Sequence, residues 1–134
     1  MQNSNAEYHS KLARSYSRLA YIHKDKTLFE KAVHHFTVSI ALNSQDAFTY
    51  SHLGEAYKRN KMYEEAVLEL KKAIALDPDN AFFHLRLASI YRKKGASKEA
   101  KKEYERVLEI LPHNKETKET ITELIDTLNP ALKK

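Results

Sequence analysis

Residues 47–80 read AFTYSHLGEAYKRNKMYEEAVLELKKAIALDPDN, and residues 81–114 follow at once as AFFHLRLASIYRKKGASKEAKKEYERVLEILPHN. The two segments align over 34 positions without a gap, and moving back by the same period places a more divergent copy at residues 13–46. Self-similarity at such a fixed period is the signature of a repeat protein in which each copy is one supersecondary unit. This repeat decides the fold, so the remaining features are interpreted relative to it.

Apolar residues within each copy follow helical spacing. In the second copy one set is spaced i, i+3, i+4, i+7, and a later set repeats the rule, which predicts two amphipathic helices per copy. These two sets are Tyr50, Leu53, Gly54, Tyr57 and then Tyr63, Ala66, Val67, Leu70, Ala73, Ile74. With only two glycines and three prolines in 134 residues, the chain has the composition of long helices with short connections. The predicted fold class is all-α.

Helix boundary signals recur with the same period. Pro78 and Pro112 are expected to end the second helix of their copies, because proline disfavours helical geometry in the residue before it. Asp46, Asn80 and Asn114 each precede the next helical segment, where their side chains can accept unpaired backbone amide hydrogens. The boundaries therefore agree with the periodicity.

The copies resemble the tetratricopeptide repeat (TPR) family. The matching residues in the second copy are Tyr50, Leu53, Gly54, Tyr57, Ala66, Ala73 and Pro78. Those in the third are Leu87, Ala88, Tyr91, Gly95, Ala100, Tyr104 and Pro112. The first copy matches at Tyr16, Leu19, Ala20, Ala32 and Phe36, and departs from the pattern at His23, Ser39 and Ser44. The resemblance implies a right-handed α-solenoid of three helix-turn-helix TPR repeats.

The segments outside the repeats extend this architecture at both ends. The apolar stripe continues upstream of residue 13, so the first helix is expected to start near Ala6. Downstream, Ile121, Leu124, Ile125 and Leu128 form one apolar stripe, and a repeat array needs such a half-polar helix to cover its last apolar face. We expect a single TPR domain over residues 1–134, divided into an N-terminal helix extension at 6–12, repeats at about 13–46, 47–80 and 81–114, a C-terminal capping helix at 115–128 and a tail at 129–134.

Composition restricts the class of protein. The chain contains no cysteine, which removes disulfides and thiolate chemistry, and no stretch approaches the roughly 20 apolar residues that span a bilayer. These features predict a soluble, cytoplasmic protein with no membrane span. The formal net charge of +5 favours an acidic partner.

Positive charge is concentrated on one side of the first helix of each copy. With about 100° per residue, six positions of each first helix point away from the apolar side. They are Arg14, Ser17, Arg18, Tyr21, Lys24 and Asp25 in the first copy, Phe48, Ser51, His52, Glu55, Lys58 and Arg59 in the second, and Phe82, Leu85, Arg86, Ser89, Arg92 and Lys93 in the third. The set holds eight cations and two anions, while charges on the second helices nearly cancel. In the family that the chain resembles, this face lines the concave groove.

Aromatic side chains among cations suit an acidic peptide with apolar anchors. We therefore predict a protein–protein interaction scaffold that binds an acidic or mixed acidic/apolar peptide segment in a basic concave groove. The predicted peptide-binding residues are Arg14, Arg18, Tyr21, Phe48, His52, Lys58, Arg59, Phe82, Arg86, Ser89, Arg92 and Lys93. Some TPR proteins hold a chaperone tail carboxylate with a Lys and Asn cluster. Of the matching positions here, only Arg86 fits, so such a clamp is not expected.

Two alternatives remain open at this point. The same basic aromatic face could bind RNA, by tracking a phosphate backbone and stacking bases. Glu55 and Asp25 lie within that face and would repel phosphates. The chain could also be a self-assembling repeat module, that is, a homo-oligomer formed through an open repeat edge.

Catalysis is not expected. The sequence has no Gly-rich phosphate loop, no zinc-protease His-Glu pattern and no cysteine nucleophile, so we predict no enzymatic activity, no cofactor and no metal site. His34 and His35 are adjacent, which points them about 100° apart on a helix and prevents joint chelation from one face. His23 and His84 replace core-side aromatic residues and are expected to pack as such.

Overall fold

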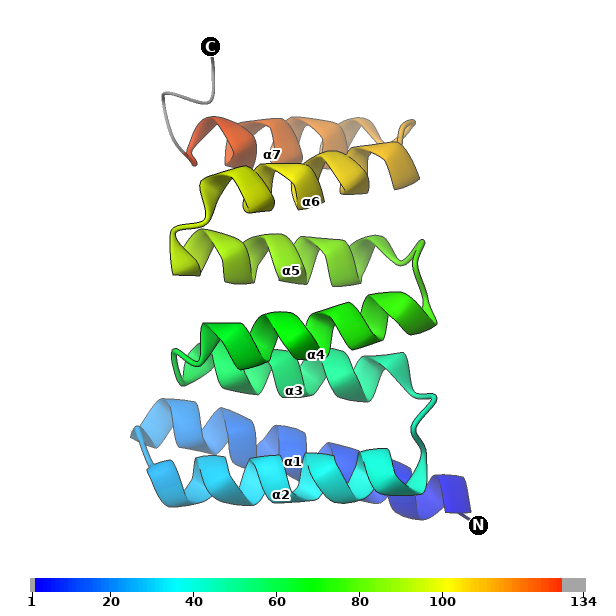
Figure 1. The fold of residues 1–134 in the computed structure, drawn as a ribbon, viewed down its shortest axis with the longest axis vertical. Helices are drawn as coiled ribbons and strands as arrows, with labels where there is room; N and C mark the ends of the chain where they lie inside the picture. The colour runs from blue at the N-terminus through cyan, green and yellow to red at the C-terminus, as the bar shows by residue number, and fades with distance from the viewer. Residues whose placement is uncertain (1, 129–134) are drawn as a thin grey trace. The chain divides into compact units, whose positions relative to one another are not determined.

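A computed structural model describes residues 2–128, and these residues form seven helices and no strand (Figure 1). The helices are α1 (Gln2–His23), α2 (Lys26–Leu42), α3 (Ala47–Arg59), α4 (Tyr63–Leu76), α5 (Ala81–Lys94), α6 (Ser97–Ile110) and α7 (Lys115–Asp126). Helices α3 and α5 begin at the first residues of the second and third predicted repeats. The predicted all-α helical repeat fold is confirmed.

The chain divides into two compact units, with the boundary between Leu76 and Asp77. Unit 1 contains helices α1 to α4, and unit 2 contains helices α5 to α7. No helix in residues 2–128 has both the length and the apolar character that crossing a membrane requires.

Unit 1 is built from two helix pairs. Helix α1 packs along α2, α3 contacts both of them, and α4 packs along α3. A core cluster joins α1, α2 and α3 through Ala13, Ala32, Phe36, Leu53 and Ala56. Three of these five side chains are alanine, whose small size lets the helices approach closely.

Gly54 marks a close approach of α3 to α4. A Cβ atom added there would overlap Cδ2 of Leu70 and lie 3.2 Å from the carbonyl oxygen of Ala66. Ala66 and Leu70 both belong to α4 and are fully buried. A larger residue at position 54 would therefore require the buried Leu70 side chain to shift.

Unit 2 consists of the α5–α6 pair with α7 packed on α6. Its core cluster contains Ala88, Ala100, Tyr104, Val107 and Ile121. The residues predicted to form the apolar stripe of the last helix pack against this cluster, because Leu124, Ile125 and Leu128 join Ile121 there.

The ends of the described chain differ in detail from the expected boundaries. Helix α1 begins at Gln2 rather than near Ala6, since no glycine or proline precedes Ala6 to stop it. At the other end, α7 stops at Asp126, so the helix is shorter than the predicted 115–128. The predicted tail at 129–134 lies outside the described residues.

Small polar residues attach the N-terminal part of α1 to its neighbours. The Ser39 hydroxyl donates a buried hydrogen bond of 2.7 Å to the carbonyl oxygen of Ala6. Thr49 of α3 donates a second buried bond, of 3.3 Å, to the hydroxyl of Ser10. The departure from the family pattern at Ser39 thus has a structural role, because it fixes the extension of α1 onto α2.

The turn within each helix pair contains one residue in the left-handed backbone region. These residues are Lys24 (φ 51°), Lys61 (φ 60°) and Gly95 (φ 85°). In each turn the amide of the following residue bonds back to a carbonyl five residues earlier, as from Asp25 to Ala20 at 3.0 Å. This is the usual C-terminal motif of helices, in which glycine is the favoured left-handed residue.

Candidate functional site

The predicted binding residues of unit 1 lie on α1 and α3, which contact each other. We call them the unit 1 surface: Arg14, Arg18, Tyr21, Phe48, His52, Lys58 and Arg59. Arg14, Arg18, Tyr21 and Phe48 are exposed, whereas His52 and Lys58 are half-buried. The structure brings Arg59 and Tyr21 together, with the guanidinium 5.6 Å from the ring centroid.

Glu55 reduces the positive charge of the unit 1 surface. One carboxylate oxygen lies 3.2 Å from Nζ of Lys58, and the other lies 3.6 Å from Nε of Arg59. The Glu55 and Lys58 side chains are mostly buried, so this pair is less screened by water than an ordinary surface pair. Arg14 and Arg18 are exposed and therefore contribute most of the accessible charge on α1.

The predicted binding residues of unit 2 all lie on α5. We call them the unit 2 surface: Phe82, Arg86, Ser89, Arg92 and Lys93. The Arg86 guanidinium lies 4.6 Å from the centroid of the Phe82 ring, within the range of a cation–π contact. Phe82 is 42% exposed, and Arg92 and Lys93 are exposed in the last turn of the helix. The unit 2 surface thus combines an accessible aromatic ring with three cations.

Not every residue expected to point outward does so. Ser17 and Ser51 were included in the outward set, but both are buried. For Ser17 the reason is that α1 packs against α3, so part of the outward arc becomes a helix contact. A helical wheel drawn for one helix cannot predict which of its outward residues a neighbouring helix buries.

Of the two histidines that are expected to pack in the core, the structure buries only one. His84 is buried, with Nδ1 at 2.7 Å from Oε2 of Glu103 and Nε2 at 2.7 Å from the carbonyl oxygen of Pro78. His23 is exposed, so its predicted core position is wrong. Helix α1 ends at His23, and α2 begins three residues earlier in its repeat than α4 and α6 do. The core of the first pair therefore ends before it reaches His23.

Sequence reasoning missed a cluster of aromatic rings across α1 and α2. Nδ1 of His9 and Nδ1 of His35 are 3.0 Å apart, and the His35 ring stacks on both His9 and Tyr16. Burial, followed by the charges of His34 and His9, lowers the pKa of His35. His9 and Tyr16 are seven residues apart, hence on one face of α1, which is the signal that could have indicated a shared partner.

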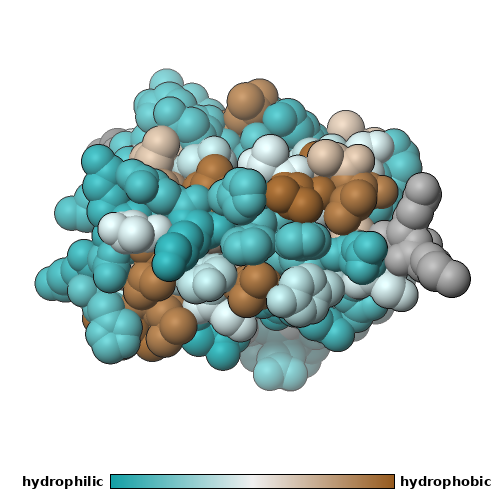
Figure 2. Space-filling view, turned by 90° about the horizontal axis from the view of Figure 1, so that it is seen from below, coloured by the Kyte–Doolittle hydropathy of each residue, from teal (hydrophilic) through white to brown (hydrophobic). Residues whose placement is uncertain are grey.

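Within residues 2–128, no group of three or more histidine, aspartate or glutamate side chains is arranged to hold a metal ion. Tyr104 is buried in unit 2, and this burial raises its pKa. On the face of unit 1 formed by α1 and α2, apolar patches alternate with hydrophilic side chains (Figure 2). The candidate binding features of the described residues are the contacts between a guanidinium and an aromatic ring on the first helices, Arg59 with Tyr21 and Arg86 with Phe82.

Two family models match the chain. One, described as a TPR repeat, matches residues 62–95, and the other, described as a tetratricopeptide repeat, matches residues 83–114. No curated protein matches the sequence.

Several solved structures have a similar fold. The second TPR domain of the human RPAP3 protein, in complex with the HSP70 peptide SGPTIEEVD, is 23% identical, with 88% of this chain and 96% of that chain covered and a TM-score of 0.66. The Yersinia enterocolitica type III secretion chaperone SycD, in complex with a peptide of the translocator YopD, is 19% identical, with 85% and 89% covered and a TM-score of 0.67. A thermophilic TPR protein of Thermus thermophilus, TTC0263, is 23% identical, with 86% of this chain and 61% of that chain covered and a TM-score of 0.76.

Proposed function

Because the chain belongs to the tetratricopeptide repeat family, we propose that it is a protein-interaction scaffold whose first helices bind acidic peptide segments that carry apolar residues. Binding is an equilibrium docking event, with no chemical step. The unit 1 surface and the unit 2 surface each supply a binding region.

The observation that carries the proposal is the pairing of an exposed aromatic ring with a guanidinium in both units. Arg59 lies over Tyr21 in unit 1, and Arg86 lies over Phe82 in unit 2. Exposed rings supply anchor area for an apolar side chain, while neighbouring cations attract and orient carboxylates. Tyr21 is 61% exposed, although folding of the repeat does not require an aromatic side chain there.

Proteins with a similar fold support the docking of peptides on this architecture. The human RPAP3 domain and the Yersinia chaperone SycD were both solved with peptides bound. The RPAP3 ligand, SGPTIEEVD, combines acidic residues with isoleucine and valine. We propose binding of acidic peptides with apolar residues, and not of a chaperone tail held by a carboxylate clamp. The Lys and Asn cluster of such clamps is not reproduced in this chain, where Arg86 alone fits.

Charge reversal on the unit 2 surface tests the proposal. The variant Arg86→Glu/Arg92→Glu should capture no partner from a cell extract that the wild-type protein captures, because two attractive cations become repulsive. Lys98→Glu/Lys102→Glu on the exposed side of α6 is the matched control, and it should capture the partner normally. Circular dichroism should show equal helicity for all three proteins.

Two outcomes would contradict the proposal. Undiminished capture by the Arg86→Glu/Arg92→Glu variant would show that the unit 2 surface is not used. Binding to unrelated RNA sequences with equal affinity and a steep dependence on salt would indicate a nucleic-acid-binding protein instead.

A further inference from the structure

A pocket in unit 1 includes the Arg59–Tyr21 pair and extends from it to the two turns that contain Lys24 and Lys61. It has a volume of about 670 Å³, is open to solvent, and is lined by the end of α1, the start of α2 and the end of α3. This volume falls in the range of roughly 300–1,000 Å³ that is typical of ligand sites.

The floor of the pocket is apolar. Ala20, Phe29 and Ala56 line it, and Phe29 is in turn supported by an edge contact with Tyr57 at 6.0 Å between ring centroids. Tyr21 and Ile22 form part of the wall, and Ile22 is 62% exposed. An apolar side chain inserted here would cover surface that this chain leaves in contact with water.

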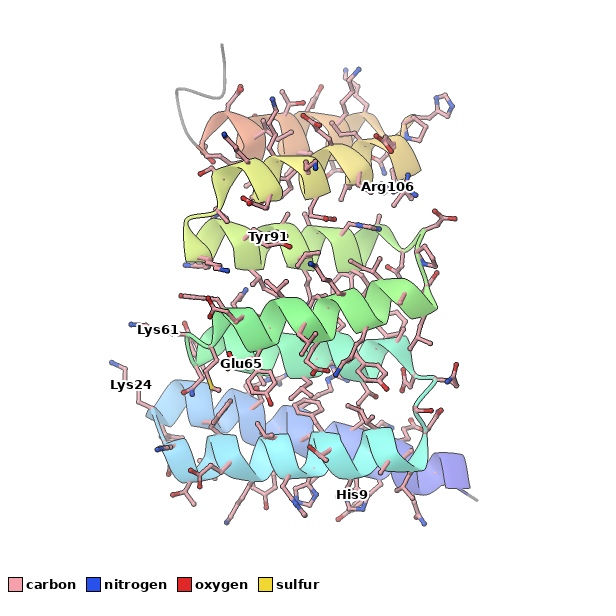
Figure 3. All side chains as sticks on the ribbon, in the orientation of Figure 1. His9, Lys24, Lys61, Glu65, Tyr91 and Arg106 are labelled. Carbon is pink, nitrogen blue, oxygen red and sulfur yellow. The ribbon has the colours of Figure 1, made fainter. Side chains whose placement is uncertain are left out.

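The rim of the pocket is cationic. Lys24, Lys26, Arg59 and Lys61 line it from three different segments, and Lys24 and Lys61 extend from the same edge of unit 1 (Figure 3). In residues 2–128 none of the three lysines forms an ion pair. The acidic residue of the lining, Asp25, already accepts hydrogen bonds from the backbone amides of Thr27 and Leu28 through Oδ1.

Each of the three lysines occupies a position that local backbone physics does not favour for lysine. Lys24 and Lys61 have φ values of 51° and 60°, where a side chain is strained and glycine is preferred. Lys26 is the first residue of α2, where the helix dipole favours an acidic side chain. The corresponding turn of unit 2 has the favoured residue, Gly95.

A purely structural explanation accounts for only part of this pattern. A cation near a helix C-terminus interacts favourably with the dipole, and this applies to Arg59, Lys24 and Lys61. It does not apply to Lys26 at a helix N-terminus. Residues that depart from local preference concentrate at functional sites, and these three converge on one pocket with an apolar floor.

We propose that this pocket binds one apolar side chain of an acidic peptide while the lysine rim pairs with the carboxylates on either side of it. The inference rests on the proposed peptide-binding function and adds a specific anchor site at the turn edge of unit 1. The charge of the rim and the apolar floor together select the occupant, because neither a fully apolar nor a fully acidic segment would satisfy both.

Fluorescence polarisation with three labelled heptapeptides tests this inference. The probe EEELEEE should bind the wild-type protein, EEESEEE should bind at least fivefold more weakly because it lacks the anchor, and KKKLKKK should not bind. In Lys24→Gly/Lys61→Gly the affinity for EEELEEE should fall at least tenfold, although glycine is the favoured residue at both positions. The variant Lys24→Asn/Lys61→Asn provides a second way to remove both charges, since asparagine also tolerates this backbone conformation.

The controls separate this inference from the proposed function. Lys98→Ala/Lys102→Ala removes the same charge from α6 and should change the affinity less than twofold. Normal binding of EEELEEE by both pocket variants, together with loss of binding in Arg86→Glu/Arg92→Glu, would overturn the pocket and leave the proposed function standing. Failure of the wild-type protein to bind EEELEEE would also overturn the pocket, whereas the capture experiment would still decide the proposed function.

Discussion

The two units meet the same backbone requirement with different residues. The turn between paired helices needs one residue with positive φ, which is Lys24 or Lys61 in unit 1 and Gly95 in unit 2. At the close approach of paired helices the glycine is instead in unit 1, as Gly54, and unit 2 has Ala88 at the equivalent position of the repeat. The comparison shows that a repeat position fixes a conformation or a distance, while the side chain placed there can be used for another purpose.

The largest expected effect on the free energy of unfolding comes from giving unit 1 the alanine that unit 2 has at the close approach of its paired helices. Gly54→Ala should lower the free energy of unfolding by about 1–3 kcal/mol, because the added methyl group overlaps the buried Leu70 side chain. Urea unfolding followed by circular dichroism measures this change. The reverse substitution in unit 2, Ala88→Gly, should cost about 1 kcal/mol through backbone entropy. A more stable Gly54→Ala variant would show that α3 and α4 leave room for a methyl group at position 54.

The attachment of the N-terminal extension, which only unit 1 has, is expected to give the next largest effect. Ser39→Ala should cost up to about 1.5 kcal/mol, since it removes the buried hydrogen bond that the Ser39 hydroxyl donates to the Ala6 carbonyl oxygen. Amide hydrogen exchange should accelerate mainly in the first turns of α1. Thr37→Ala is the control, because the exposed Thr37 hydroxyl bonds only to Val33 within α2. Equal effects of the two substitutions would contradict the role assigned to Ser39.

Substitutions at the left-handed turn positions of the two units test whether lysine is strained there and glycine is not. Lys61→Gly should raise the free energy of unfolding by about 1 kcal/mol by removing left-handed strain, and Gly95→Ala should lower it by a similar amount. A Cβ atom at Gly95 meets no other atom within 4 Å, so that cost comes from the backbone alone. Thermal unfolding of both variants measures the pair of effects. A destabilised Lys61→Gly variant would mean that the lysine side chain contributes to folding.

The smallest expected effect is a dependence of unit 1 stability on pH. Burial lowers the folded-state pKa of His35, so the unfolded state takes up the proton first as the pH falls. This contribution to stability is present above about pH 6.5 and is lost as the pH falls from there through the lowered pKa. The melting temperature of His35→Phe should therefore decrease less between about pH 7.5 and pH 5.5 than that of the wild-type protein. The exposed His113→Gln variant should behave like the wild type.

Helix positions could be predicted from the sequence better than the exposure of individual side chains. The 34-residue period located α3 and α5 at Ala47 and Ala81, because helix boundaries depend on local capping and spacing. The exposure of Ser17 and His23 was misjudged, because it depends on where a neighbouring helix packs and where a helix ends. The Lys24–Lys61 edge could not be foreseen either, since the two turns are distant in sequence and meet only through the packing of α3 on α1 and α2.

Chemical-shift mapping tests the central claim most directly. A peptide with two apolar positions, EELEEEEFEE, would be titrated into ¹⁵N-labelled protein. We predict that the largest shifts fall on the exposed sides of α1, α3 and α5, including the amides of Arg18, Tyr21 and Arg86. Largest shifts on the outward sides of α4 and α6, around Lys71 and Lys102, would contradict the assignment of binding to the first helices.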